Sequence, residues 1–397
     1  HKDMDALGIM RPDSMPKATN HICNICSFIK VLEDKGFAYA RGGDVYYSVF
    51  KNKNYGKLSN QNILEQNINQ QGRMTTDESN KKDNPQDFAL WKKAKENEPF
   101  FDSPWGKGRP GWHIECSAMV KDELGETIDI HLGGSDLIFP HHENEIAQSE
   151  SANNKKLANY WLHNGMVNVN GQKMSKSLKN FTTIRDLLDS GTSPMTLRYF
   201  VLTVNYRKPL DFTDEALRSA SEAWKNINVA LSFFDITKKE NLSIEVNETN
   251  EFVEETYKDM INYEISQKKI KFTNALNNDL NTAGAIAIIY ELAKPLKNFI
   301  NQFQRIKNLE INTNEKFHLR ETFKTLEELT DVLGLKKEEI IIDNRINEDQ
   351  ILSLINKRLV AKKEKDYAEA DKIRNSLKEK GVELIDQSPE LTTWVRI

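Results

Sequence analysis

The spacing of apolar positions divides the chain into a mixed front part and a helical rear part. Apolar residues at helical spacing predict a helix over 20–35, ended by Gly36, and an apolar run at 45–50 predicts a strand. Over 214–340, glycine and proline nearly disappear and long amphipathic patterns follow, which predicts a helical bundle. Within it, Asn281 or Thr282 is the expected N-cap of a helix starting at Ala283.

The remaining segments complete the predicted organisation. Residues 345–397 combine a basic helix, Gly381 and a short strand, which predicts a small separate module. Residues 51–86 are polar and poor in apolar side chains, which favours a surface insertion. The expected divisions are listed in order along the chain: 1–180, an α/β domain with this insertion; 181–213, a connecting region; 214–340, the bundle; and 345–397, the C-terminal module.

Charge and cysteine content narrow the function classes. The sum of 55 basic and 59 acidic side chains gives a net charge of −4, so nucleic-acid contact requires a local basic face. No stretch approaches 18 uncharged apolar residues, which argues against a membrane-spanning helix. Three cysteines cannot form a disulfide scaffold, and we expect a cytoplasmic protein. The chain opens with His1 and reads like the middle of a domain, so we expect a missing N-terminal segment.

One candidate metal site combines Cys116, His141 and Glu145. His141 and Glu145 are four residues apart, on one face of a helix that Pro140 is suited to open. Three such ligands are typical of a zinc site that leaves room for a substrate. An ordinary helix N-terminus with acidic residues explains the pair equally well by spacing alone. His142 and Glu143 are competing ligands.

The Cys23–Cys26 pair is the second place where a metal is conceivable. Both residues lie inside the helix predicted over 20–35, and no second pair of this spacing follows. We therefore interpret them as buried structural cysteines.

Two short motifs suggest contacts with a nucleotide. A predicted strand ends at Gly133 and Gly134, where a ligand can approach the backbone, and Asp136 is placed to accept a hydrogen bond from a ribose hydroxyl. A plain tight turn is the alternative. Residues 173–177 carry two lysines and two serines between a predicted strand at 166–169 and a predicted helix at 184–188. Such a loop can neutralise phosphate charge as it closes, and a generic basic loop is the alternative.

Four motifs together resemble one family. These are GWHIECSAM (111–119), HLGGSD (131–136), FPHHENEIAQS (139–149) and KMSKS (173–177), and they closely resemble cysteinyl-tRNA synthetase. The resemblance extends over essentially the whole chain. It implies an α/β fold, with the Rossmann-like catalytic domain of a class I synthetase, its N-terminal part missing, followed by an α-helical bundle and a small C-terminal anticodon-binding module.

The resemblance also implies an activity. L-cysteine and ATP, with Mg²⁺, would give cysteinyl-adenylate, and the cysteinyl group would pass to the 3′ end of tRNA(Cys). One zinc ion per chain would select the substrate thiolate and be held by Cys116, His141 and Glu145. The family's fourth ligand, a cysteine, and its HIGH-type ATP signature have no counterpart here. We expect a monomer with no membrane contact.

The remaining site residues follow from the same resemblance. The catalytic lysines would be Lys176 and Lys173. ATP would also contact Ser175, Gly133, Gly134 and Asp136. Trp112 would line the cysteine pocket, with a packed core tryptophan as the alternative. The anticodon would meet Tyr367, Asp371 and Arg374 within a basic segment that contains Lys357, Arg358, Lys362, Lys363, Lys365 and Lys372.

Three alternatives to this interpretation stay open. The basic segment can be an ordinary solvated helix face. The chain can be a cysteine-activating ligase that uses an amino-sugar as acceptor, although the C-terminal module argues against it. It can also be a tRNA- or zinc-binding fragment without activity.

Overall fold

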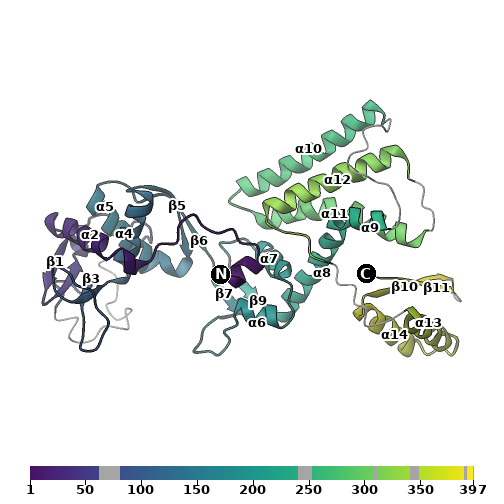
Figure 1. Ribbon diagram of the computed structural model, residues 1–397, viewed down its shortest axis with the longest axis horizontal. Coiled ribbons are helices and arrows are strands. Elements are labelled where there is room, and N and C mark those ends of the chain that lie inside the picture. Colours follow the sequence, from purple (N-terminus) through teal and green to yellow (C-terminus); the bar gives the residue numbers. More distant parts are fainter. Residues whose placement is uncertain (62–80, 240–252, 307–310, 340–347, 389–390, 397) are drawn as a thin grey trace. The chain divides into compact units, whose positions relative to one another are not determined.

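The computed structural model describes residues 1–397 except 62–80, 240–252, 307–310, 340–347, 389–390 and 397 (Figure 1). It consists of two compact units. The first contains residues 10–181 and 206–212, and the second contains residues 1–9, 182–205 and 213–397. The chain therefore enters each unit more than once. Among the described residues, none of the helices is both long and apolar enough to cross a membrane.

The first unit begins with a four-stranded antiparallel sheet. Its strands pair in chain order: β1 (Ala38–Arg41), β2 (Asp44–Tyr47), β3 (Phe88–Lys93) and β4 (Gly108–Pro110). The strand predicted at 45–50 is confirmed only to Tyr47, because Val49–Lys51 form a 3-10 turn. Every residue of β2 is buried, which makes this strand the centre of the packing.

Three helices pack around this core. They are α2 (Ile22–Asp34), α4 (Trp112–Leu124) and α5 (Glu143–Asn153). Helix α2 confirms the helix predicted over 20–35, and it buries Ile25, Ile29 and Leu32 against the sheet. Cys26 is half-buried there, but Cys23 is exposed, so the interpretation of both as buried cysteines is wrong for Cys23. Its apolar neighbours in the sequence belong to the other face of the helix.

Two smaller sheets complete the first unit. Strands β5 (Ile128–Gly134) and β6 (Ala158–Asn164) form a parallel pair whose register runs from Ile128–Ala158 to Gly134–Asn164. Strands β8 (Gln172–Lys173), β7 (Val167–Val169) and β9 (Leu210–Phe212) form a three-stranded sheet in that order. The parallel pair ends at the two glycines that the sequence singled out.

Where the structure describes the second unit, it is helical apart from one hairpin. Its helices before the C-terminal module are α1 (Lys2–Ala6), α6 (Ile184–Asp189), α7 (Pro194–Leu202), α8 (Asp214–Leu231), α9 (Phe233–Lys239), α10 (Glu255–Asn277), α11 (Thr282–Arg305) and α12 (Thr313–Val332). The Asn281 side chain accepts a hydrogen bond from the Gly284 backbone N–H, which confirms Asn281 as the N-cap of α11.

The C-terminal module has its own small core. Helices α13 (Glu348–Lys363) and α14 (Tyr367–Glu379) are followed by the antiparallel hairpin β10 (Val382–Ser388) and β11 (Leu391–Arg396). Ile351, Ile355, Leu377 and Val382 form the buried centre, so the strand predicted after Gly381 is confirmed.

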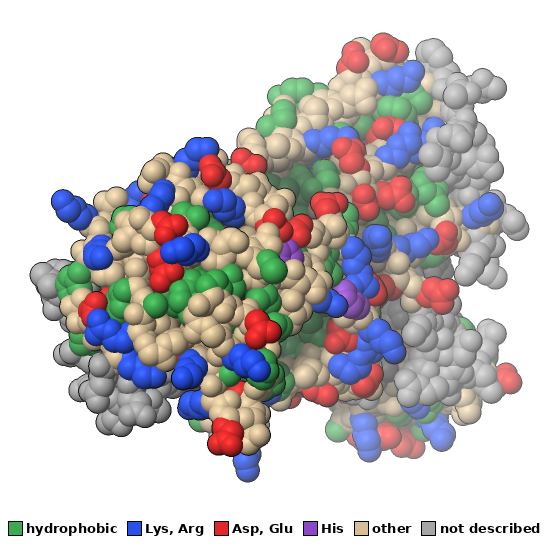
Figure 2. Space-filling view, turned by 60° about the vertical axis from the view of Figure 1, so that its left-hand side comes forward, with side chains coloured by type: hydrophobic (Ala, Val, Ile, Leu, Met, Phe, Trp, Pro, Cys, Tyr) green, Lys and Arg blue, Asp and Glu red, His purple; other side chains and the backbone are tan. Residues whose placement is uncertain are grey.

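The surface agrees with the small net charge. In the view of Figure 2, acidic, basic and hydrophobic side chains are interspersed over the face that is shown. Any binding of a polyanion therefore depends on the arrangement of a few basic groups.

Candidate functional site

The structure brings Cys116, His141 and Glu145 together. Cys116 lies on α4, His141 lies in the π-helical turn Ile138–His142, and Glu145 lies in the first turn of α5. One ligand atom from each side chain lies within 4.8 Å of the others. Phe139 is extended, with φ −134° and ψ 132°, and helical backbone follows it, so the helix opens near Pro140 as the sequence predicts.

Glu145 is the least satisfied side chain of this cluster. It is 0% exposed, and neither carboxylate oxygen accepts a hydrogen bond from any described residue. His131 Nε2 lies 3.2 Å from one oxygen and His141 Nε2 lies 3.8 Å from the other. A buried carboxylate without donors is costly, so the geometry favours a cation beside it.

His141 is oriented by a second histidine. The Nδ1 atoms of His141 and His113 lie 2.8 Å apart, so one ring donates a hydrogen bond to the other. This contact leaves His141 Nε2 on the side of Glu145. Burial lowers the pKa of both imidazoles, that of His113 to about 3. A neutral imidazole with one nitrogen fixed is the usual state of a metal ligand.

Cys116 lies in surroundings that oppose its thiolate. Burial, helped by Glu145 and Glu115, raises the pKa of the Cys116 thiol to about 12. The apo cluster therefore holds a neutral thiol beside neutral imidazoles. A divalent cation inverts this balance, because it favours the deprotonated form of a coordinating thiol.

A second trio shares Glu145. His131, His142 and Glu145 also place ligand atoms within 4.8 Å of one another. His142 Nδ1 lies 2.8 Å from His163 Nε2, and burial lowers the pKa of His142 to about 3. The sequence predicts His142 as a competing ligand, and its position in this second trio agrees with that prediction. The roles of His113 and His163 were not predicted, because their contacts with His141 and His142 join positions 28 and 21 residues apart through tertiary packing.

Glu143, the other competing ligand, is engaged elsewhere. Its carboxylate is fully buried and accepts hydrogen bonds from the backbone N–H groups of Gly56, Leu58 and Ser59 and from the Ser59 hydroxyl, at 2.9 to 3.0 Å. Glu143 is therefore excluded as a ligand of this cluster. The contacts also show that the start of the segment 51–86 is tied to α5, although its residues 62–80 lie outside the described residues.

Trp112 is a surface residue of the site. It is 58% exposed, and its ring stacks on that of His141 at a centroid distance of 4.5 Å. The alternative of a packed core tryptophan is wrong. The exposed indole therefore covers the buried imidazole of His141, which also packs against the rings of His113 and His142.

The glycines at the end of β5 make room for the histidines. A Cβ atom on Gly133 would lie 2.4 Å from His142 Cε1, and one on Gly134 would lie 2.6 Å from Asp136 Oδ1. Asp136 is exposed directly after the strand. Gly133 is therefore required by the packing of His142, which is a stronger constraint than a plain turn.

The loop at 173–177 is organised by its own side chains. The Ser175 backbone N–H donates to Asn180 Oδ1 at 2.8 Å, and Ser175 Oγ accepts from the Leu178 N–H at 3.2 Å. Lys173 and Lys176 are exposed, and Lys176 Nζ lies 5.7 Å from the centre of the Phe181 ring. Among the described residues, neither ammonium group has a carboxylate within 4.0 Å, so both are available to an anion.

The C-terminal module presents a polar helix face. Tyr367, Asp371 and Arg374 are exposed and lie on one side of α14 at spacings of four and three residues. Arg358 does not belong to this surface. It is buried and donates two hydrogen bonds to Asp386, at 2.8 and 2.9 Å, so its place in the predicted basic surface is wrong. Its periodicity on α13 points to the core.

Two family models match the chain. Residues 1–222 match the catalytic domain described as tRNA synthetases class I (C), and residues 271–337 match the DALR domain. The chain is also similar to solved structures of Mycobacterium tuberculosis methionyl-tRNA synthetase. The complex with methionyl-adenylate is 16% identical, with a TM-score of 0.54 over 84% of this chain and 75% of that one. This likeness supports the class I fold alone and confirms the expected α/β fold class.

Curated relatives carry the family assignment further. The chain is 98% identical over 397 residues to a cysteine–tRNA ligase of Prochlorococcus marinus subsp. pastoris, and 94% identical to that of Prochlorococcus marinus strain MIT 9515. It is 51% identical over 404 residues to that of Synechococcus sp. strain CC9902. All of this chain is covered in each case, with 81%, 81% and 80% of the relatives. The chain therefore belongs to the cysteine–tRNA ligases, class I synthetases that join cysteine to tRNA.

Proposed function

We propose that this chain selects cysteine through a zinc ion held by Cys116, His141 and Glu145. The observation that carries the proposal is the buried Glu145 carboxylate, which accepts no hydrogen bond within the described part of the chain and lies beside a thiol and an oriented imidazole. When bound, zinc prefers a thiolate and lowers the pKa of a thiol that coordinates it. The set that contains a cysteine suits this soft ligand chemistry better than the set of His131 and His142.

The side chains around the cluster would supply the rest of the pocket. Trp112 would form one wall, since its exposed indole lies on the imidazole of His141. Packing alone separates cysteine from serine or alanine only modestly, because such pockets gain about 1–3 kcal/mol per small group. Recognition of the sulfur itself would supply the larger difference, and it explains why no separate editing domain is needed.

ATP, accompanied by Mg²⁺, would bind where β5 ends and along the loop at 173–177. Gly133 and Gly134 would let the nucleotide approach the backbone, and Asp136 would accept a hydrogen bond from the ribose. Lys176 and Lys173 would neutralise charge that develops on the phosphates, while Ser175 would help to shape the loop. The exposure of both ammonium groups supports this role.

The C-terminal module would read the anticodon of tRNA(Cys). Tyr367 is 63% exposed at the start of α14, where its ring is free to stack on an unpaired base. Asp371 and Arg374 would form hydrogen bonds with base edges from the same side of the helix. We further propose that the protein works as a cytoplasmic monomer, which light scattering during size-exclusion chromatography tests.

Metal content and cysteine activation together test the proposal. The protein expressed at the full length of its curated relatives, purified without chelator, should contain about one zinc ion and catalyse cysteine-dependent exchange of pyrophosphate into ATP. Cys116→Ala should lose both the metal and the exchange, because one of three ligands is removed. Cys23→Ala is the matched control, since Cys23 is exposed on α2 and outside the cluster. Retention of zinc and of exchange by Cys116→Ala would contradict the proposal.

A further inference from the structure

The chain leaves the helical bundle through a firmly held segment, residues 333–338. Gly334 has φ +63°, and a Cβ atom there would lie 2.3 Å from a guanidinium nitrogen of Arg198 on α7. Arg198 Nε donates a hydrogen bond to the Leu333 carbonyl at 2.8 Å. Leu335 is buried. The turn after α12 is therefore built around the Arg198 side chain.

Glu338 is the centre of these contacts. Its carboxylate accepts hydrogen bonds from Ser193 Oγ and Trp224 Nε1, both at 2.6 Å, and from the Met195 backbone N–H at 3.3 Å. Ser193 is the N-cap of α7, so the carboxylate lies where that helix has unpaired N–H groups and a positive dipole end. One side chain thus joins α7, α8 and the segment that follows α12.

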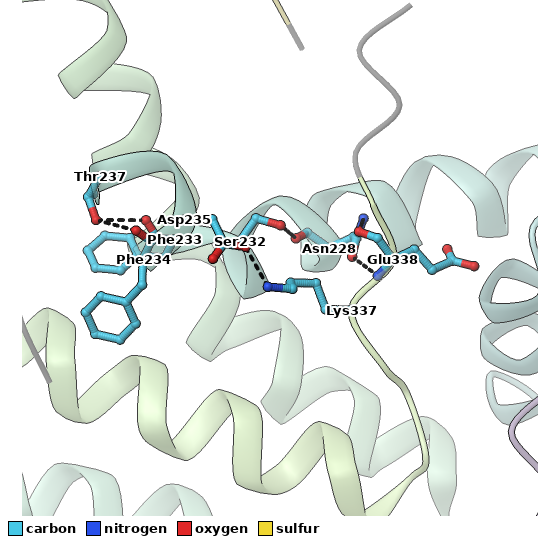
Figure 3. Close-up of polar contacts among 8 residues, drawn as sticks. All are labelled: Asn228, Ser232, Phe233, Phe234, Asp235, Thr237, Lys337 and Glu338. Atoms are coloured by element: carbon cyan, nitrogen blue, oxygen red, sulfur yellow. Dashed lines mark hydrogen bonds and ion pairs between the residues drawn. The ribbon is translucent and has the colours of Figure 1, made fainter. Parts of the chain in front are cut away.

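The backbone of Glu338 is held as well. Its N–H donates to Asn228 Oδ1 at 2.9 Å, and its carbonyl accepts from Asn228 Nδ2 at 3.1 Å. Figure 3 shows these two contacts, with the Glu338 side chain pointing away from Asn228. Lys337 forms an ion pair with Asp235 of α9 beside them. Position and direction of the backbone are therefore both fixed at this residue.

Glu338 lies shortly before the C-terminal module, and we call its set of hydrogen bonds the anchor. After residue 339 the chain passes through 340–347 to α13, the first helix of the C-terminal module. A segment held only by apolar contacts can rotate, whereas hydrogen bonds to both backbone and side chain specify one orientation. Glu338 is thus the last described residue of the bundle with such contacts before the module begins.

We propose that Glu338 is a positioning residue for tRNA binding. It fixes the point at which the chain leaves the bundle toward the C-terminal module, and so limits where that module can meet a tRNA that the catalytic part also binds. Two linked contacts reinforce each other only if the geometry lets both form at once. The inference rests on the proposed tRNA contact of the module, and it separates Glu338 from residues that touch cysteine or ATP.

Glu338→Gln in the full chain tests this inference, with the exposed neighbour change Glu339→Gln as a control of equal charge. Fluorescence anisotropy would give the Kd for a tRNA(Cys) transcript, and cysteine-dependent pyrophosphate exchange without tRNA would report on activation. We expect Glu338→Gln to weaken tRNA binding about fivefold, as a lost geometric link between two contacts does, with exchange changed less than about twofold. Glu339→Gln should change neither.

Ser193→Ala serves as a second variant, because it removes one donor to the carboxylate and leaves Trp224 in the core. It should reduce tRNA binding in the same direction, and its effect should not add fully to that of Glu338→Gln. A parallel loss of exchange and tRNA binding in both variants would show a role in stability only and overturn the inference.

Arg374→Ala separates this inference from the function on which it rests. Weaker tRNA binding in Arg374→Ala, together with unchanged binding in Glu338→Gln, would overturn the anchor alone. Unchanged binding in Arg374→Ala would remove the proposed role of the module and the anchor with it. Weaker binding in both variants would support both.

Discussion

Glu143 and Glu145 show how much a two-residue separation changes the role of a carboxylate. Both are fully buried in the first turn of α5. Glu143 accepts four hydrogen bonds from residues 56–59, whereas Glu145 accepts none from the described residues. A buried charge must be paired or hydrogen-bonded, so the carboxylate of Glu143 is structurally complete, whereas that of Glu145 supports the proposed cation site.

Replacing Glu143 should loosen the segment that it holds. Glu143→Gln keeps the size of the side chain but lacks the charge and one acceptor oxygen, so we expect a loss of about 1–3 kcal/mol in the free energy of unfolding. Urea unfolding followed by circular dichroism measures this loss. Hydrogen exchange of the amides of Gly56, Leu58 and Ser59 should become faster in the same variant.

The exposed Glu96 offers a control for that experiment, because it has the same charge and lies outside this contact. Glu96→Gln should leave both stability and exchange unchanged. Equal stability of Glu143→Gln and the parent protein would show that the four hydrogen bonds contribute nothing net.

Among the residues of the candidate site, the sequence predicts local pairs but not contacts between distant segments. The spacing of His141 and Glu145 is local, and a helix brings them together whatever else happens, so the pair was predictable. Cys116 was added to them because a thiolate is a competent zinc ligand, and the resemblance favoured this set over the competing ligands. His113 was not predicted, because its contact with His141 depends on how α4 packs against α5. The engagement of Glu143 with residues 56–59 also depends on tertiary contact across more than 80 positions.

At the scale of elements, the two glycines at the end of β5 differ in what an added side chain would contact. An added Cβ atom at Gly133 would overlap the ring of His142, which is itself buried. At Gly134 it would meet only the end of the Asp136 side chain, and the backbone there, with φ −72° and ψ 154°, suits any residue. The strand end therefore combines a packing requirement at Gly133 with a proposed nucleotide contact at Gly134.

The two alanine variants should accordingly differ in what they damage. Gly133→Ala should destabilise the protein by about 1–3 kcal/mol, as overpacking of a core does, and reduce its metal content. Gly134→Ala should keep the thermal midpoint within a few degrees but raise the KM for ATP in pyrophosphate exchange, because the Asp136 carboxylate must move. Thermal unfolding and exchange kinetics distinguish the two. A destabilised Gly134→Ala with an unchanged KM would contradict this assignment.

A second element, the β10–β11 hairpin, depends on an ion pair between the buried Arg358 and the solvent-exposed Asp386. Arg358 holds the pKa of Asp386 well below its usual range, with help from Lys362 and Thr392. Asp386→Asn leaves the buried guanidinium without its counter-ion. Because Asp386 itself is exposed to solvent, we expect a loss of about 1–3 kcal/mol in the free energy of unfolding near pH 7. Hydrogen exchange of the β10 and β11 amides at pH 7 tests whether the loss is confined to this module.

The same pair gives a pH dependence with a definite sign. Because the folded pKa of Asp386 is depressed, its stabilising effect is complete above the unfolded pKa of about 3.9 and is lost as the pH falls below it toward the folded value. The stability difference between the parent protein and Asp386→Asn should thus be constant from pH 8 to about 5 and shrink below about 4. Urea titrations at several pH values measure it, and a difference that grows on acidification would exclude this mechanism.

Helices were predicted better than the connections between them. The helix over 20–35 and the Asn281 cap follow from local periodicity and side-chain hydrogen bonds, and both are confirmed. Strand β9 at 210–212 pairs with β7, which lies about 40 residues earlier, and no local sequence pattern predicts that pairing. Arg358 was predicted to be a surface cation, because its charge alone does not indicate that Asp386, 28 residues later, is its counter-ion.

At the scale of the whole molecule, the division into units departs from simple sequence order. Residues 1–9 pack with the second unit, where Arg198 Nη1 donates a hydrogen bond to the Leu7 carbonyl at 2.9 Å. Residues 206–212 return to the first unit. The composition of the sequence could not predict that residues 1–9 and 206–212 belong to a different unit from their neighbours. Each of these segments is short and resembles its neighbours in composition.

The net charge of −4 makes a prediction about tRNA binding by the whole chain. Bulk attraction to a polyanion is absent, and Figure 2 shows acidic and basic groups interspersed on the visible face. Affinity must then come from a few phosphate and base contacts, each of which releases counter-ions. A plot of log K for tRNA(Cys) against log salt should be linear and of modest slope.

The exposed end of α14 allows the contacts to be counted. Lys378 is exposed and lies four residues after Arg374, on the same side of the helix. If Lys378 meets a phosphate, Lys378→Ala should reduce the steepness of the salt plot by about 0.7–0.9 and weaken binding of all tRNAs alike. Arg374→Ala should instead reduce the preference for tRNA(Cys) over tRNAs with other anticodons, because a contact with a base edge carries sequence information and a contact with phosphate does not. Lys258→Ala on α10 is a control with the same loss of charge, and it should alter neither slope nor preference. Identical salt slopes and identical tRNA preference in all three variants would show that α14 is a solvated helix face, and that recognition of the tRNA lies elsewhere in the molecule.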